Sequence, residues 1–250
     1  MNEIGNKMDQ SVLLQDAVFK FLGDAATYAG GEVRRIDTHA AAVFLAGNRA
    51  YKVKRAVRFP FLDYSTLVTR KAACIAELEV NQPHAPELYR RIVPITREAH
   101  GKLAIDGKGE PIEWAVEMVR FDENQTLDRL AETKGIDDAL ADKLAVTVTQ
   151  MHARAPIVDV SPWLTAVEKY IDQATAAFQV NPALFPTDAV LILDRGLRSS
   201  LSRLRSLLLN RGRSGLVRRG HGDLHLGNVA LLNGKPVPFD AIEFDPMIAS

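Results

Sequence analysis

The sequence predicts an α+β protein built from two parts, a small unit of strands around one helix and a larger, mainly helical unit. Two observations favour this division. Within residues 31–121, short apolar runs alternate with turn-rich pieces, and only one segment has helical periodicity. Within residues 122–250, four segments have helical periodicity and only two short runs resemble strands. A further helix is predicted ahead of both parts, within residues 1–30.

The first part is predicted to form a sheet, with one helix between its early and late strands. The N-terminal helix is expected over residues 11–22, and Gly30 and Gly31 break the chain after it. A Gly-Asn turn between two apolar runs predicts a β-hairpin, and residues 66–80 predict the helix. The predicted strands are residues 33–37, 42–45, 49–57, 92–95, 103–105 and 112–121.

The second part is predicted to be helical, with one small hairpin close to its end. The predicted helices are residues 127–133, 137–153, 163–178 and 187–209. Two short apolar runs, residues 229–232 and 236–239, bracket Asn233-Gly234, a pair that strongly favours a hairpin turn. The sequence stops ten residues after Asp240 without an evident closing element, so a shortened second part is expected.

Composition and charge exclude several classes of protein. The 31 basic residues balance the 31 acidic residues, so net charge gives no reason to expect nucleic acid or an anionic membrane as a partner. The polar N-terminus lacks the basic-then-apolar pattern of a signal peptide, and no stretch of 18 apolar residues could span a membrane. The single cysteine, Cys74, cannot form an internal disulfide and is expected to be packed in a helix. We therefore expect a soluble, cytoplasmic protein.

Polar and ionisable side chains gather around the predicted hairpin near the end of the chain. They are His221, Asp223, His225, Asn228, Asp240, Glu243 and Asp245. Phosphoryl transfer needs a carboxylate near the attacking hydroxyl and oxygen ligands that hold Mg²⁺ against the nucleotide phosphates. Because the turn at Asn233-Gly234 returns Asp240 to the side of Asn228, these two residues are expected to bind one metal ion together.

The spacing His221-x-Asp223-x4-Asn228, followed by an aspartate at the end of the next strand, resembles the catalytic and metal-binding loops of the protein-kinase-like superfamily. The form His-Gly-Asp-Leu-His-x-Gly-Asn is similar to the aminoglycoside phosphotransferase and choline kinase branch. The resemblance implies that Asp223 is the catalytic base and that His221 holds the loop in shape. It also implies that Asn228 and Asp240 bind Mg²⁺. Protein kinases usually have a lysine two residues after the catalytic aspartate, and His225 at this place favours a small-molecule substrate with a hydroxyl group.

The first part resembles the nucleotide-binding lobe of the same superfamily. Ala50 precedes Lys52 by two residues, as in the Ala-x-Lys strand in which alanine lies against adenine and lysine binds the α- and β-phosphates. Lys54 lies on the same face of the strand by alternation and is the alternative phosphate ligand. The glutamate partner of this lysine is expected on the next helix, where Glu77 is favoured and Glu79 is the alternative.

The resemblance also implies a hinge and a fold. Residues 116–119 are expected to form the hinge, in which backbone groups at Glu117 and Met118 face adenine. The implied fold is a protein-kinase-like α+β fold of two lobes. A nucleotide-binding lobe is expected over residues 31–121, and a helical lobe with the catalytic and metal-binding loops over residues 122–250.

Four motifs resemble a bacterial family of aminoglycoside-phosphotransferase-like proteins. They are Thr38-His39 with Val43-Phe44-Leu45, Tyr51-Lys52-Val53-Lys54, Phe61-Leu62-Asp63-Tyr64-Ser65-Thr66-Leu67, and residues 221–228. Many members carry a further P-loop ATP-binding domain, which implies a P-loop ATPase domain as a partner in a longer natural protein. This chain has no Gly-x4-Gly-Lys-[Ser/Thr] motif of its own, and no Gly-x-Gly-x-x-Gly precedes Lys52 to cover the phosphates.

The sequence is compatible with three functions. The leading one is an ATP- and Mg²⁺-dependent phosphotransferase that moves the γ-phosphate to a hydroxyl of a small molecule. The second is a nucleotide-binding regulatory module without transfer activity, against which the complete set of Asp223, Asn228 and Asp240 argues. The third is a metal-dependent hydrolase with Zn²⁺ or Mn²⁺ on His221, Asp223 and His225. That hydrolase would leave Asn228, Asp240 and the lysine hairpin unexplained.

Overall fold

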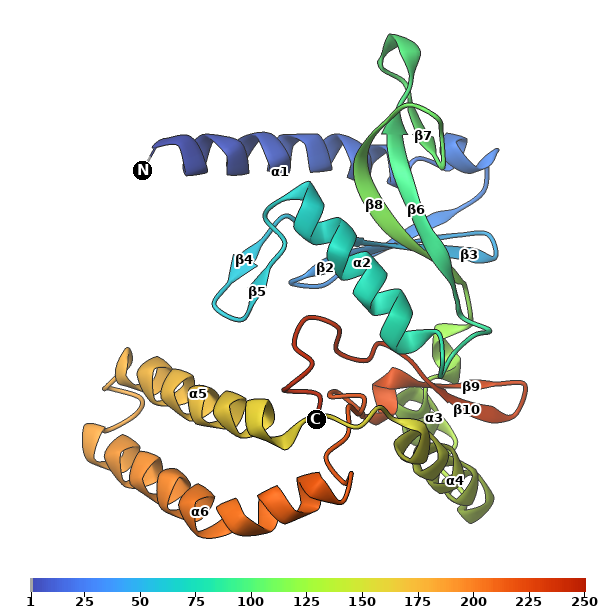
Figure 1. Ribbon diagram of the computed structural model, residues 1–250. Helices are drawn as coiled ribbons and strands as arrows, with labels where there is room; N and C mark the ends of the chain where they lie inside the picture. The colour runs from blue at the N-terminus through green and yellow to red at the C-terminus, as the bar shows by residue number, and fades with distance from the viewer. Residues whose placement is uncertain (1) are drawn as a thin grey trace. The chain divides into compact units, whose positions relative to one another are not determined.

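An antiparallel sheet and a set of helices belong to two different parts of the chain (Figure 1). The computed structural model describes residues 2–250, with side chains described from Leu13 onward. One unit comprises Met1–Ala145 and Leu224–Phe244, and the other comprises Val146–Asp223 and Asp245–Ser250. The sheet lies in the first unit, and the second unit is mainly helical. The predicted α+β, protein-kinase-like two-lobe fold is confirmed.

Six strands form the sheet of the first unit in the order β1-β2-β3-β8-β6-β7, and every pair is antiparallel. The strands are β1 (Val33–Asp37), β2 (Ala41–Ala46), β3 (Arg49–Lys54), β6 (Tyr89–Arg97), β7 (Leu103–Ile105) and β8 (Glu110–Val119). In this register Lys52 of β3 lies opposite Val43 of β2 and Val116 of β8. The middle of β3 is therefore enclosed by a strand on each side.

The predicted hairpin between β2 and β3 is present, with Gly47 and Asn48 as its turn. Gly47 has a φ of 56°, a left-handed conformation that glycine adopts without a steric penalty. A second, smaller hairpin follows β3 and joins β4 (Arg58–Phe59) to β5 (Leu62–Asp63). These two short strands were not predicted from the sequence.

Two helices pack on opposite faces of the sheet, α1 (Asn2–Gly23) and α2 (Leu67–Asn81). The helix α1 includes the predicted residues 11–22 but begins well before them. Its buried side chains Val18, Phe19 and Leu22 pack with a set from the strands: Phe44, Tyr51, Val53, Val93, Ile95 and Ala115. On the other face, Cys74 of α2 packs with a second set: Leu45, Ala50, Val116 and Met118. The prediction that Cys74 is packed in a helix is confirmed.

A capping box explains where α2 begins. Thr66 Oγ1 accepts a hydrogen bond from the N–H of Thr69 at 3.1 Å, and Thr69 Oγ1 accepts one from the N–H of Thr66 at 3.2 Å. Both bonds satisfy backbone donors that a helix start otherwise leaves unpaired. The predicted helix at residues 66–80 is thus confirmed within one residue at each end.

The rest of the first unit comes from two distant stretches of sequence. The helix α3 (Leu127–Thr133) packs against the hairpin of β9 (Val229–Leu232) and β10 (Lys235–Pro238), and α4 (Asp138–Arg154) begins in this unit. Asn233 and Gly234 form the hairpin turn with φ values of 50° and 74°. Positive φ at both central residues is the geometry that Asn-Gly favours, so the predicted hairpin is confirmed.

In the second unit, α5 (Val160–Gln179) and α6 (Thr187–Arg213) pack against each other. Gly212 allows a close approach, because a Cβ there would lie 2.3 Å from Val160 Cβ. The last residues of the chain are bonded to α5: Trp163 Nε1 donates to the carbonyl of Ser250 at 3.2 Å, and Tyr170 Oη donates to Asp245 Oδ2 at 2.7 Å. The short 3₁₀ helices in the described part of the chain are Ala25–Tyr28, Ala99–Gly101, Glu123–Gln125 and Leu226–Asn228.

None of the helices in the described part of the chain combines the length and the hydropathy needed to cross a bilayer.

Candidate active site

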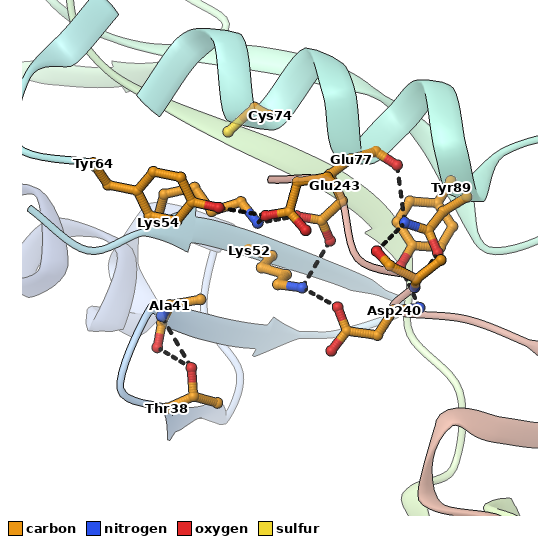
Figure 2. Close-up of polar contacts among 12 residues, drawn as sticks. Thr38, Ala41, Lys52, Lys54, Tyr64, Cys74, Glu77, Tyr89, Asp240 and Glu243 are labelled. Carbon is orange, nitrogen blue, oxygen red and sulfur yellow. Dashed lines mark hydrogen bonds and ion pairs between the residues drawn. The ribbon is translucent and has the colours of Figure 1, made fainter. Parts of the chain in front are cut away.

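Three segments of the first unit bring charged side chains together beside β3 (Figure 2). Lys52 Nζ lies 2.7 Å from Glu77 Oε1 and 2.5 Å from Asp240 Oδ1. Lys54 Nζ lies 2.5 Å from Glu77 Oε2. Both lysines that the sequence offered as alternatives therefore contact Glu77, and Lys52 also contacts the expected metal ligand Asp240.

The helix α2 presents Glu77 to the lysines from its buried face. The buried positions of this helix are Arg70, Ala73, Cys74, Glu77 and Asn81. Their spacing of three and four residues places them along one side of an α-helix. The Glu77 side chain is 0% exposed, whereas Glu79 lies on the exposed side. Of the two predicted glutamates, Glu77 is thus the one that pairs with the lysines.

Asp240 has a left-handed backbone conformation that its neighbours hold in place. Its φ is 62°, and this region costs a non-glycine residue about 1–2 kcal/mol. Tyr89 Oη accepts a hydrogen bond from the N–H of Asp240 at 3.1 Å. Asn81 Oδ1 accepts from the N–H of Ala241 at 2.8 Å, and Asn81 Nδ2 donates to the carbonyl of Ala241 at 3.4 Å. Strained backbone that the surroundings enforce is typical of functional sites.

Asn228 lies beside the Asp240 segment across the β9–β10 hairpin. It ends the 3₁₀ helix Leu226–Asn228, and it is buried. Its carbonyl accepts a hydrogen bond from the N–H of Phe239 at 2.9 Å, so Asp240 follows directly after the residue that pairs with Asn228. One carboxylate and one amide oxygen form a donor set that suits Mg²⁺, which takes its remaining oxygens from water and phosphate.

The residues of the His221–Asn228 motif are divided between the two units. His221 and Asp223 belong to the second unit, and His225 and Asn228 to the first. His221 is buried, and its Nδ1 accepts a hydrogen bond from the N–H of Asp223 at 3.4 Å, whereas Asp223 itself is exposed. His225 Nδ1 accepts from the N–H of Gly227 at 3.1 Å and caps the 3₁₀ helix. Both histidines therefore shape the local backbone.

The structure gives no support to the hydrolase alternative. Among residues 13–250, whose side chains the structure describes, no group of three or more His, Cys, Asp or Glu side chains has the arrangement of a metal site. A structural or catalytic zinc site would need three or four such ligands.

The predicted hinge lies at the end of β8, inside the sheet. Met118 pairs with Ala50 and packs with it on the face that carries Lys52. The side chain of Glu117 lies on the opposite face, only 4% exposed, where its oxygens lie 3.0 Å from Arg49 Nη1 and 2.9 Å from Arg91 Nε. Ala50 and Met118 therefore share the face of the sheet that carries Lys52, whereas the Glu117 side chain pairs with two arginines on the other face.

Burial and neighbouring charges act in opposite directions on the two lysines. Burial lowers the pKa of Lys52, but the carboxylates of Asp240 and Glu77 outweigh it and raise the pKa well above its ordinary value. Burial likewise lowers the pKa of Lys54, and Glu77 and Glu243 raise it more. Both lysines are therefore protonated at neutral pH, which is the state that a phosphate-binding lysine requires.

Comparison with known proteins agrees with this geometry. A family profile described as the phosphotransferase enzyme family matches residues 35–239. The chain belongs to this family. Among its relatives are Uncharacterized protein Rv2004c of Mycobacterium tuberculosis and Uncharacterized protein Mb2027c of Mycobacterium bovis. Each is 28% identical over 214 residues, which is 84% of this chain and 41% of the relative, so the chain spans about two fifths of the length of these proteins.

Membership of the phosphotransferase family identifies the chain as kinase-like, as the sequence pattern predicted. Sequence reasoning missed the side chains that hold the site together, namely Asn81, Tyr89 and Tyr64. For Asn81 a signal existed, because it follows Glu77 by four residues and so shares its side of the helix. Tyr64 lies within one of the four family motifs, but the motif does not reveal which group its hydroxyl contacts.

Proposed function

We propose that the chain is a phosphotransferase that uses ATP and Mg²⁺ to phosphorylate a hydroxyl group of a small molecule. The observation that supports this most directly is the cluster of Lys52, Glu77 and Asp240. A buried glutamate from a helix, a lysine from the middle of a strand and an aspartate at a strand end are the parts that kinase-like enzymes use to bind nucleotide phosphates.

Each side chain has a defined task in this proposal. Lys52, oriented by Glu77, donates N–H groups to the α- and β-phosphates. Asn228 and Asp240 hold Mg²⁺, which neutralises the charge that builds up on the phosphate oxygens. Asp223 accepts the proton of the acceptor hydroxyl as the new oxygen–phosphorus bond forms and the bond to the β-phosphate breaks. Ala50 and Met118 contact the adenine ring.

Nucleotide binding is the first test, by isothermal titration calorimetry and thermal unfolding with Mg·ATP. At a ligand concentration 100 times Kd, binding should stabilise the folded chain by about 2.7 kcal/mol. Lys52→Met removes a charge-assisted hydrogen bond worth about 1.5–3 kcal/mol and should weaken affinity about tenfold or more. Asp240→Asn should act similarly with little change of backbone, because asparagine tolerates positive φ. Lys102→Met is the matched control, since Lys102 is exposed.

Phosphate transfer is the second test, by release of ADP in the presence of a panel of alcohols, sugars and amino alcohols. Asp223→Asn should lower transfer by about 10²–10⁴-fold while Mg·ATP affinity stays that of the wild type. If the wild type binds Mg·ATP but no acceptor and no water receives phosphate, the regulatory alternative replaces the enzyme. Absence of Mg·ATP binding by the wild type would refute both.

A further inference from the structure

A second set of buried polar groups lies next to the proposed phosphate-binding lysine. Lys54 Nζ lies 2.5 Å from Glu243 Oε1 as well as 2.5 Å from Glu77 Oε2. Tyr64 Oη donates to the same Glu243 oxygen at 2.5 Å, as Figure 2 shows. The side chains of Lys54 and Glu243 are 3% and 7% exposed. None of these three side chains has a task in the transfer reaction proposed above.

The charges of this cluster are unequal in number. Two lysines, Lys52 and Lys54, face three carboxylates, Glu77, Asp240 and Glu243. Burying a carboxylate destabilises the folded protein unless a cation or several hydrogen-bond donors pair with it. With fewer lysines than carboxylates, each lysine contacts two carboxylates. The two oxygens of Glu77 are divided as well: Oε1 contacts Lys52 and Oε2 contacts Lys54.

We propose that Lys54 is a positioning residue for Lys52: by pairing with Glu243, it keeps this carboxylate from drawing Lys52 away from Glu77 and the nucleotide. The inference rests on the proposed function. It also explains why two lysines alternate on one face of β3.

The competition between carboxylates follows from the geometry. Without Lys54, Glu243 would keep only the neutral hydroxyl of Tyr64 among these contacts. Lys52 is the neighbouring cation, and the charge of Glu243 already acts on it. Burial lowers the pKa of Lys52, and the carboxylates of Asp240, Glu77 and Glu243 together raise it. An unpaired buried carboxylate would therefore attract Lys52 and take up N–H donors that should face the phosphates.

The test compares Lys54→Met with the double variant Lys54→Met/Glu243→Gln. Two quantities are measured at 10 °C, the Kd for Mg·ATP and, without nucleotide, the rate at which acetic anhydride acylates Lys52, followed by mass spectrometry. We expect Lys54→Met to raise Kd about tenfold, the effect of about one charge-assisted hydrogen bond, and to slow acylation of Lys52. The double variant should return both quantities to within about threefold of the wild type, because the competing carboxylate is gone.

A matched control separates positioning from general loss of stability. Ile95 of β6 is 0% exposed and packs with α1 on the face of the sheet opposite Lys54. Ile95→Ala leaves a cavity in that core and should lower stability without changing the acylation of Lys52 or the Kd. If Lys54→Met does not fold, Lys54→Gln, which keeps a donor for Glu243, replaces it with the same expectation.

Three results would overturn the inference. They are wild-type affinity and wild-type acylation in the Lys54 variant, no recovery in the double variant, and equal weakening by Ile95→Ala. Failure of the wild type to bind Mg·ATP refutes the proposed function instead, and the acylation rates still decide whether Lys54 positions Lys52.

Discussion

Replacing Asn81 by alanine should release Asp240 from the conformation in which it meets Lys52. The Asn81 side chain is 1% exposed, and it makes both polar contacts of Ala241 described above. Ala241 is itself buried, so its N–H would lose its partner inside the protein. An unsatisfied buried donor costs about 1–3 kcal/mol. We therefore expect Asn81→Ala to lower the free energy of unfolding by about 2 kcal/mol in urea denaturation.

The same substitution should weaken nucleotide binding through the backbone of Asp240. The left-handed conformation at φ 62° costs about 1–2 kcal/mol, which is comparable with the contribution of the Asn81 contacts. If about one molecule in ten keeps Asp240 in place, the apparent Kd for Mg·ATP rises about tenfold, because only the competent fraction binds. Calorimetric titration measures this directly.

The control for Asn81→Ala is Gln82→Ala at the neighbouring position. Gln82 is exposed and donates to the carbonyls of Tyr89 and Arg90 at 3.3 and 3.2 Å. Gln82→Ala should change the free energy of unfolding by less than about 0.5 kcal/mol and leave the affinity for Mg·ATP unchanged. Wild-type affinity in a destabilised Asn81→Ala protein would refute the reasoning, since it would show that the Asn81 contacts do not hold Asp240 in its binding conformation.

Three further predictions concern stability and reactivity. Burial would raise the pKa of Glu243, but the positive charges of Lys54 and Lys52 outweigh it, so this pKa lies below the ordinary 4.5. The stability advantage of the wild type over Glu243→Gln should therefore be constant above pH 4.5 and should shrink as the pH falls further. Urea unfolding from about pH 3 to 8 measures this advantage. An advantage that grows toward acid would contradict this sign. Burial raises the pKa of the Cys74 thiol to about 12, so a thiol reagent at pH 8 should label Cys74 only in denaturant. Rapid labelling of Cys74 in the folded protein would be inconsistent with its burial. Arg70→Met should cost about 3–5 kcal/mol, because it leaves the buried carboxylate of Glu113 without a cation and with only the neutral donors of Gln15 and Trp114. Arg129→Met, at the exposed ion pair with Glu132, should cost under about 1 kcal/mol. Equal losses in urea denaturation would show that burial is not the cause.

Elements set by local chemistry were predicted closely from the sequence. The β9–β10 hairpin follows from Asn233-Gly234, whose two residues adopt the positive φ values that this turn requires. The helix α2 follows from its periodicity and from the threonines that cap its start. The choice of Glu77 over Glu79 was also within reach, since only Glu77 lies on the side of the helix that carries Cys74.

Features that depend on distant contacts could not be read from the sequence. Alternation places Lys52 and Lys54 on the same face of β3, so their local environments look equivalent. Their roles differ because Asp240 contacts Lys52 and Glu243 contacts Lys54, and these partners lie 188 and 189 residues away in the sequence. The face on which the Glu117 side chain lies likewise depends on the register of β8 against β3, in which Glu117 pairs with Tyr51 and Val116 pairs with Lys52.

The double role of Asp240 explains why the site needs a buried glutamate. Asp240 contacts Lys52 and is also the proposed Mg²⁺ ligand, and its side chain is 44% exposed. A cation at Asp240 would weaken the attraction between this carboxylate and Lys52, because both positive charges draw on the same oxygens. Glu77, at 0% exposure, keeps its charge close to Lys52 whatever binds at Asp240. In the proposed function, Lys52 therefore remains anchored through Oε1 of Glu77 while its other N–H donors turn to the phosphates.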